Sequence, residues 1–251
     1  MSRFYRYRQS FYRRMHEFWN LPQLVWTKKQ AGKSKMINIV FEGSPGAGKT
    51  TIIANIEKKL NEYGIKVGKT VDIDPTTPLY PILHDMNSHT PLVTSNEQFN
   101  TVLYETFLQV SDYVYSRERI IAQKNEINIF DRAYFSIYAY QKVLLEEKYG
   151  NMCKPLLKNL LDILKFSSKK IDIVFYFADK DNIYINRAQQ RNNSKFTDYE
   201  IETLKLFEKE LNSIVEMERN YELIYVLNEN LQNTIDEILK KILEFYELRR
   251  K

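Results

Sequence analysis

Residues 43–50 read Gly-Ser-Pro-Gly-Ala-Gly-Lys-Thr and fit the pattern G-x-x-x-x-G-K-[ST]. Glycines in such a loop let backbone N–H groups curl around a phosphate, and the following helix adds partial positive charge from its N-terminus. Lys49 would reach the β- and γ-phosphates of a nucleoside triphosphate, and the Thr50 hydroxyl would bind Mg²⁺. We expect the ATP-binding residues to be Gly43, Ser44, Pro45, Gly46, Ala47, Gly48, Lys49, Thr50 and Thr51.

A second charged pair, Asp131-Arg132, directly follows a β-rich run at Ile127–Phe130. An acid at the end of a buried strand beside the phosphate loop can hold Mg²⁺ directly or through water, so Asp131 joins Thr50 as a predicted metal ligand. Arg132 can reach charge on a transferring phosphoryl group. The alternative interpretation is a solvated ion pair that closes a strand.

Short β-rich runs alternate with longer helical segments from residue 36 onward, which favours an α/β domain with a mainly parallel sheet of five strands. The phosphate loop lies between the first strand and a helix over Lys49–Tyr63, which Gly64 would cap. Further helices are expected from Ser95 to about Gln123, over 133–148, over 152–166 and at the C-terminus, and 74–94 reads as a long irregular connection. The predicted strands are Met36–Glu42, Ile65–Asp72, Ile127–Phe130, Ile171–Ala178 and Leu223–Leu227.

Length and composition exclude several classes of protein. With 251 residues, 43% of them hydrophobic, the chain can bury a large core, and its longest strongly apolar run is far shorter than the roughly 20 residues of a membrane span. The single cysteine and the lack of zinc-ligand spacing favour a cytoplasmic setting. The chain also lacks the Asn-Lys-x-Asp and Asp-x-x-Gly motifs of a GTPase switch.

Residues 1–35 form a basic arm ahead of the domain at 36–251. The first 36 residues hold nine Lys or Arg against one acid, whereas the rest carries a net charge of −3. Aromatic and apolar residues recur at helical spacing, so the arm is predicted to be amphipathic. It could pack on the domain or on a second subunit, contact a polyanion or a membrane surface, act as a transit peptide, or form a tail.

The segment Asp131–Gln141 resembles the D-R-Y-x-x-S-x-x-A-Y-Q signature of thymidylate kinases. Together with Phe41-Glu42-Gly43 and the end of the phosphate loop, it is similar to the thymidylate kinase and deoxynucleoside kinase group. The resemblance runs from about residue 36 to 245. It implies a P-loop kinase fold, a three-layer sandwich with a helical lid, which uses ATP and Mg²⁺ to phosphorylate a nucleoside or nucleoside monophosphate. It also implies a homodimer.

Two further motifs gain roles from this resemblance. Arg187 and Arg191 lie four residues apart on one helix face and are similar to the R-x-x-x-R lid that closes over the donor phosphates, so both are expected to be catalytic. Asp74-Pro75 resembles the Glu-Pro whose carboxylate accepts the proton of the acceptor hydroxyl. The alternative for the arginine pair is an ordinary solvated helix face. The alternative for Asp74 is a residue that begins a turn before Pro75.

The expected acceptor region is poor in cations, because no Lys or Arg occurs from Thr70 to Ser116. A monophosphate would require arginine donors there, and only Arg132, Arg117 or Arg119 could serve, so the acceptor is predicted to be a neutral hydroxyl compound such as a nucleoside. The predicted acceptor-binding residues are Asp74, Tyr80, Gln98, Tyr104, Arg132, Tyr138 and Gln141.

Two departures from the family pattern keep other functions open. Ile73 stands where thymidylate kinases have arginine, and Ala133 stands where the signature has tyrosine. A kinase of a non-nucleotide hydroxyl compound and an ATP-binding regulatory protein with a degenerate acceptor site are therefore the alternatives.

Overall fold

The structure is a computed structural model. It describes residues 36–72, 74–89, 102–168, 170–178, 183–192, 195–217 and 220–250, without the side chains of 87–89 and 191–192. The basic arm at 1–35, Ile73, Gln98 and the expected helix start at Ser95 lie outside the described residues.

A five-stranded sheet in the order β2-β3-β1-β4-β5 forms the centre, and every neighbouring pair is parallel. The predicted five-stranded parallel sheet is confirmed, with strand ends that differ from the expected ones by no more than two residues. The bounds are β1 Ile37–Gly43, β2 Val67–Thr70, β3 Ile127–Asp131, β4 Ile173–Phe177 and β5 Glu222–Tyr225.

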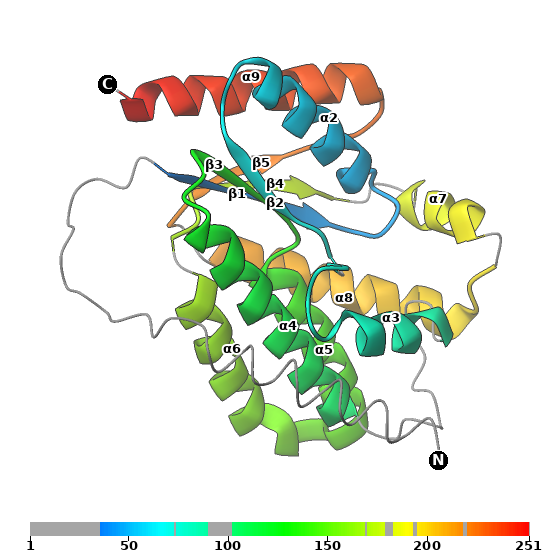
Figure 1. The fold of residues 1–251 in the computed structure, drawn as a ribbon. Helices are drawn as coiled ribbons and strands as arrows, with labels where there is room; N and C mark the ends of the chain where they lie inside the picture. Colours follow the sequence, from blue (N-terminus) through cyan, green and yellow to red (C-terminus); the bar gives the residue numbers. More distant parts are fainter. Residues whose placement is uncertain are drawn as a thin grey trace, which may run out of the picture. The chain divides into compact units, whose positions relative to one another are not determined.

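Side chains of β1 alternate between two helical layers, as the two-residue period of a strand requires. Ile39 and Phe41 pack with α2 (Lys49–Glu62) and α9 (Leu231–Arg250), which cover one face of the sheet. Val40 packs on the other face, which is covered by α4 (Val102–Ala122), α5 (Tyr134–Tyr149), α6 (Lys154–Ser168) and α8 (Asp198–Met217) (Figure 1). The three-layer sandwich is therefore confirmed, and β1 is buried along its whole length.

The predicted helices after β2 are present with small shifts. Helix α4 is described from Val102 to Ala122, α5 spans Tyr134–Tyr149, and α6 spans Lys154–Ser168 after a short 3₁₀ turn at Gly150–Cys153. Helix α7 at Ile183–Asn192 carries the predicted lid arginines.

The expectation of an irregular connection over 74–94 is wrong in part, because α3 occupies Tyr80–His89. Pro81 is the second residue of this helix, where a missing N–H costs nothing because the first-turn N–H groups have no helical partner. Pro81 thus marks the beginning of a helix, whereas 74–79 is irregular as expected.

Helix α8 at Asp198–Met217 is a further element that was not predicted. Its start is a capping box: Thr197 donates its backbone N–H to Glu200 Oε2 at 2.6 Å, and Glu200 N–H donates to Thr197 Oγ1 at 3.2 Å. The Thr-x-x-Glu spacing was the available sequence signal.

The chain leaves β1 and β3 toward opposite faces of the sheet, since α2 follows β1 and α5 follows β3. In open parallel sheets, the carboxyl ends of two such strands form the usual crevice for a ligand. The phosphate loop and Asp131 both lie at this edge. Among the described residues, no helix is long and apolar enough to cross a membrane.

An asparagine chain joins the strands at the opposite, amino-terminal edge. Asn125 Nδ2 donates to Asn128 Oδ1 at 3.1 Å, and Asn128 Nδ2 donates to Asn38 Oδ1 at 3.0 Å. Asn38 Nδ2 donates in turn to the Lys170 carbonyl at 2.7 Å. All three asparagines are buried, so each hydrogen bond replaces one that water would otherwise make.

We expect Asn128→Ala to lower the free energy of unfolding by about 2 kcal/mol, because it leaves buried polar groups of Asn38 and Asn125 unpaired. Urea denaturation measures this change, with Asn159→Ala on the exposed face of α6 as the control. Substrate KM values should stay unchanged, because the chain lies at the far edge from the phosphate loop. A loss of stability no larger than that of the control would contradict the role of the chain.

Candidate active site

The phosphate loop has the backbone of an anion-binding nest. Gly43, Gly46 and Gly48 have φ values of 131°, 83° and 85°, a region that residues with a Cβ rarely adopt. Helix α2 begins directly after Gly48, and no side chain caps its N-terminus. Its first N–H groups are therefore available to a phosphate.

Gly46 also allows the lid helix to pack against the loop. A Cβ built on Gly46 would lie 2.1 Å from the Tyr184 carbonyl oxygen and 2.9 Å from the Ala188 nitrogen, both in α7. Both contacts are with backbone, so no side-chain rotation could relieve them. Glycine at this position thus sets the distance between the loop and α7.

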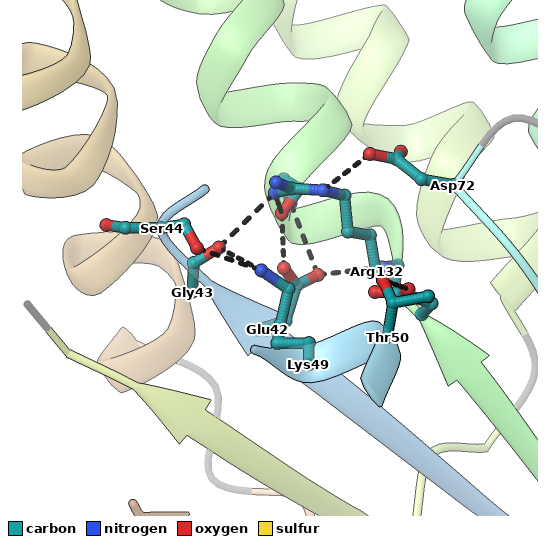
Figure 2. A network of polar contacts seen from close by, with 10 residues as sticks. Glu42, Gly43, Ser44, Lys49, Thr50, Asp72 and Arg132 are labelled. Atoms are coloured by element: carbon teal, nitrogen blue, oxygen red, sulfur yellow. Dashed lines mark hydrogen bonds and ion pairs between the residues drawn. The ribbon is translucent and has the colours of Figure 1, made fainter. Parts of the chain in front are cut away.

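Lys49 lies folded back onto the start of the loop. Its Nζ donates to the carbonyl oxygens of Gly43 at 2.9 Å and Ser44 at 3.0 Å (Figure 2). Burial, together with repulsion from Arg132, lowers the pKa of Lys49 to about 7. A phosphate in the nest would give this ammonium an anionic partner in place of two neutral carbonyls.

Thr50 and Asp131 are brought together as predicted. Thr50 Oγ1 donates to Asp131 Oδ2 at 2.7 Å (Figure 2). Burial raises the pKa of Asp131, and the nearby Lys49 opposes that rise. A hydroxyl and a carboxylate are hard oxygen ligands that suit Mg²⁺, which usually takes only one or two protein ligands beside phosphate and water. Among the described residues, no group of three or more His, Cys, Asp or Glu could hold a metal ion.

Arg132 adopts a left-handed backbone conformation with φ 70°, which is uncommon for a residue with a side chain. Its N–H donates to the Phe41 carbonyl at 2.9 Å. Its guanidinium donates to Asp72 at 2.8 Å, to Ser136 Oγ at 3.1 Å and to the Gly43 carbonyl at 3.4 Å (Figure 2). Lys49 and Arg132 therefore converge on one carbonyl oxygen at the start of the phosphate loop.

Glu42 is a site residue that sequence reasoning did not assign. Its carboxylate is fully buried and accepts hydrogen bonds from the Ala133 N–H at 2.7 Å, the Ser136 N–H at 3.4 Å and the Ser136 hydroxyl. It thus caps the N-terminus of α5, which has no cap of its own. Burial raises the pKa of Glu42 to about 7. The signal in the sequence was an acid within a strand that is apolar apart from Asn38.

Asp74 has features of both interpretations made from the sequence, a turn residue and a carboxylate that could accept a proton. Its Oδ1 accepts the Thr76 N–H at 2.8 Å and the Thr76 hydroxyl at 2.6 Å, as in an Asx turn. Its Oδ2 pairs with the Arg119 guanidinium. The side chain is 6% exposed, so this is a buried, oriented carboxylate rather than a solvated turn residue.

The other predicted acceptor residues that the structure describes lie on α3, α4 and α5. Tyr80 begins α3 with its ring against His84, and Tyr104 is half exposed on α4. Tyr138 lies on α5 and is half-buried against two hydrophobic clusters. Gln141 is fully buried, accepting from Thr106 at 2.5 Å and donating to Gln109 at 3.0 Å, so it joins α5 to α4.

One predicted source of positive charge is excluded. Arg117 is 1% exposed, donates to the Ser168 carbonyl at 3.0 and 2.6 Å, and lies over the Phe130 ring at 3.5 Å. It holds α4 to the end of α6 and has no contact with the phosphate loop. Arg119 and Arg132 remain as cations of the acceptor side.

Asn228 connects Arg187 of α7 to the phosphate loop by hydrogen bonds. Arg187 Nη1 donates to the Asn228 carbonyl at 3.2 Å, and Asn228 Nδ2 donates to the Ala47 carbonyl at 2.8 Å. The backbone of Arg191 is one turn further along α7, and its side chain lies outside the described residues. Helix α7, which the resemblance predicts to be a lid, therefore lies beside the loop.

Comparison with known proteins agrees with this geometry. Residues 41–238 match the family described as thymidylate kinase. A probable thymidylate kinase of Sulfurisphaera tokodaii is 28% identical over 207 residues, which cover 82% of this chain and 93% of that protein. The solved structure of deoxyadenosine kinase from M. mycoides with bound dATP has a TM-score of 0.58 at 20% identity, covering 82% of this chain and 99% of the other.

We expect Glu42→Gln to change the pH dependence of stability. With the pKa of Glu42 raised from 4.5 to about 7, the folded chain retains a proton that the unfolded chain releases, so the wild-type free energy of unfolding falls as pH rises between these values. Relative to wild type, the variant should gain about 1–3 kcal/mol between pH 5 and pH 8.

Urea denaturation at the two pH values measures this difference, with the exposed Glu244→Gln as control. If the difference between variant and wild type is the same at pH 5 and pH 8, Glu42 is not the buried titrating carboxylate described above.

Proposed function

The protein belongs to the thymidylate kinase family, and from this membership and the site geometry we propose that it transfers the γ-phosphoryl group of ATP to a hydroxyl group of a nucleoside. The chain is an enzyme that carries out ATP-dependent phosphoryl transfer to a nucleoside or nucleotide. That the acceptor is a nucleoside rather than a nucleoside monophosphate is part of our proposal. The observation that carries the proposal is the convergence of Lys49 and Arg132 on the Gly43 carbonyl, beside the Thr50 and Asp131 pair.

The donor side follows from the nest and its lysine. The N–H groups after Gly48 would bind the phosphates of ATP, and Lys49 would leave the Gly43 and Ser44 carbonyls for the β- and γ-phosphate oxygens. Thr50 and Asp131 would hold Mg²⁺, which when bound neutralises charge on the phosphate oxygens. The nest, Thr50 and Asp131 are in place before the substrate arrives, so Lys49 is the donor-side group that must change partners when ATP binds.

The acceptor side favours a neutral substrate. Arg119 is paired with Asp74, and Arg132 is paired with Asp72, so each cation described beside the acceptor residues already faces a carboxylate. A monophosphate carries up to two negative charges and would compete with those carboxylates for the same guanidinium groups. The names of the relatives support either class, since one is a probable thymidylate kinase and the other a deoxyadenosine kinase.

Asp74 is our candidate for the general base. In transfer to a hydroxyl, the carboxylate accepts the proton as the hydroxyl oxygen attacks the γ-phosphorus, while the bond from that phosphorus to the bridging oxygen breaks and ADP leaves. The Thr76 hydrogen bonds and the Arg119 pair hold its two oxygens in fixed directions. Arg132 would face the transferring group, because it already contacts the first residue of the phosphate loop.

The lid would complete the site from the other side. Asn228 links Arg187 to the phosphate loop by two hydrogen bonds. We propose that Arg187 and Arg191 stabilise charge that develops on the donor phosphates. Family membership does not favour a non-nucleotide acceptor or a regulatory protein. A homodimer, and a contact of the arm at 1–35 with a polyanion, a membrane surface or a second subunit, remain proposals.

We expect Asp74→Asn to lower kcat for a nucleoside about 10²- to 10⁴-fold, because the amide cannot accept the proton, while the Kd for ATP changes less than about twofold. Acceptor-dependent ADP formation and ATP titration measure the two quantities. Asp162→Asn on the exposed surface of α6 is the control. Unchanged kcat in Asp74→Asn would remove this residue as the base.

Lys49 should make ATP binding depend on pH. In the free protein its pKa is lowered to about 7, and a bound phosphate would raise it, so binding at pH 8 takes up a proton. The affinity for ATP should therefore fall as pH rises from 7 to 9. Calorimetry at pH 8 in buffers of different ionisation enthalpy measures the uptake.

The control is Lys49→Met, which should show no such uptake and should lose about 10²- to 10³-fold in kcat/KM. Equal proton uptake by wild type and Lys49→Met would show that another group titrates.

A further inference from the structure

One face of α4 is polar although the sheet and other helices cover it. Residues three or four positions apart share a face of a helix, and a buried face is normally apolar. Here the shared face is formed by side chains that are all buried or half-buried: Glu105, Gln109, Asp112, Ser116 and Arg119. Gln109 is accounted for, since it bonds Gln141 of α5 and Glu105 of α4. The C-terminal half of this face has no such explanation.

Three of its atoms are buried without a hydrogen-bond partner among the described residues: Asp112 Oδ1, Ser116 Oγ and Arg119 Nε. Asp112 is 5% exposed and Ser116 is 6% exposed. Each unpaired buried polar atom costs about 1–3 kcal/mol, and a charged one costs more. Three such atoms lie on one helix face, and one of their residues, Arg119, pairs with the candidate base Asp74, so they point to a group that binds there. We call Asp112, Ser116 and Arg119 the α4 polar cluster.

The cluster adjoins the proposed site of transfer. Arg119 pairs with Asp74, and Asp112 bonds Thr77 in the turn that Asp74 begins. Asp112 also interacts electrostatically with Asp74, Asp72 and Arg119. A molecule whose hydroxyl reaches Asp74 therefore has the rest of its body within reach of this face of α4.

The charges around the cluster define what it can bind. Asp72, Asp74 and Asp112 bring three carboxylates, against the two guanidinium groups of Arg119 and Arg132. Burial raises the pKa of Asp112, so a ligand that donates a hydrogen bond to this carboxylate would stabilise its charged form. A phosphate or carboxylate would be repelled, whereas a neutral N–H or O–H donor would be attracted.

We propose that the α4 polar cluster binds the body of the acceptor, with Asp112 Oδ1 accepting a hydrogen bond from a neutral N–H or O–H group of a nucleoside. This inference rests on the proposed function and specifies how the acceptor is selected. Ser116 and Arg119 Nε would satisfy further polar atoms of the same molecule. The donor could be an amino group of the base or a hydroxyl of the sugar, because both have the chemistry that the carboxylate requires.

The test compares Asp112→Asn with Glu118→Gln, an exposed carboxylate on the same helix. For the best nucleoside acceptor, Asp112→Asn should raise KM about tenfold or more, while the KM for ATP changes less than about twofold. Glu118→Gln should leave both unchanged. Because Asp112 Oδ1 has no partner among the described residues, Asp112→Asn should unfold at the same or a higher temperature than wild type without substrate.

Substrate analogues then identify the donor. If Asp112 binds the base, wild type should prefer an amino-bearing nucleoside over its keto analogue, such as adenosine over inosine, and Asp112→Asn should reduce that preference about tenfold. If it binds the sugar, the same loss should appear between the nucleoside and its dideoxy analogue. Either result supports the proposal.

Two outcomes would overturn it. Kinetics of Asp112→Asn equal to those of Glu118→Gln would mean that Asp112 does not bind the acceptor. If Asp112→Asn unfolds at a lower temperature and its KM values for ATP and for the nucleoside rise by the same factor, the cluster is structural, with bound water as its partner. If wild type instead phosphorylates no nucleoside or nucleotide, the proposed function fails before the variant is considered.

Discussion

The parallel pairing of β1 with β3 is the constraint on which the site depends. Its register sets Phe41 opposite Asp131, so the strand that enters the phosphate loop ends beside the strand that ends in Asp131-Arg132. That adjacency allows Thr50 to bond Asp131 at 2.7 Å and Arg132 N–H to bond the Phe41 carbonyl at 2.9 Å. A shift of one residue would turn Glu42 away from α5 and remove its cap.

Balanced charge in a buried space is the second theme of the site. Lys49, Arg132, Glu42 and Asp131 lie close enough to change one another's pKa, and burial opposes the charged form of each. Glu42 holds the start of α5 in place, and the left-handed backbone of Arg132 is fixed between Glu42 and Phe41. Such strained residues persist where several contacts determine them, and here they aim a guanidinium at the phosphate loop.

The sequence alone predicted the parts that depend on local pattern. The phosphate loop, the five strands, the pairing of Thr50 with Asp131 and the position of Arg187 near the loop all follow from motifs and from their order along the chain. It missed what depends on contacts between distant segments. From the sequence, Arg117 is a candidate cation for the acceptor, but in the structure it is buried against Ser168. Gln141 is a predicted substrate contact, but in the structure it bonds Thr106 of α4. Glu42 can cap α5 only because the fold packs the start of α5 against β1.

The most direct test of the account is the ratio of kcat/KM for a nucleoside to that for its 5′-monophosphate, measured for the same base with the wild-type chain. Because each guanidinium described on the acceptor side already faces a carboxylate, we predict that the nucleoside is preferred by at least about tenfold. A preference for the monophosphate would contradict the account, since it would require Arg119 or Arg132 to leave its carboxylate for the acceptor phosphate.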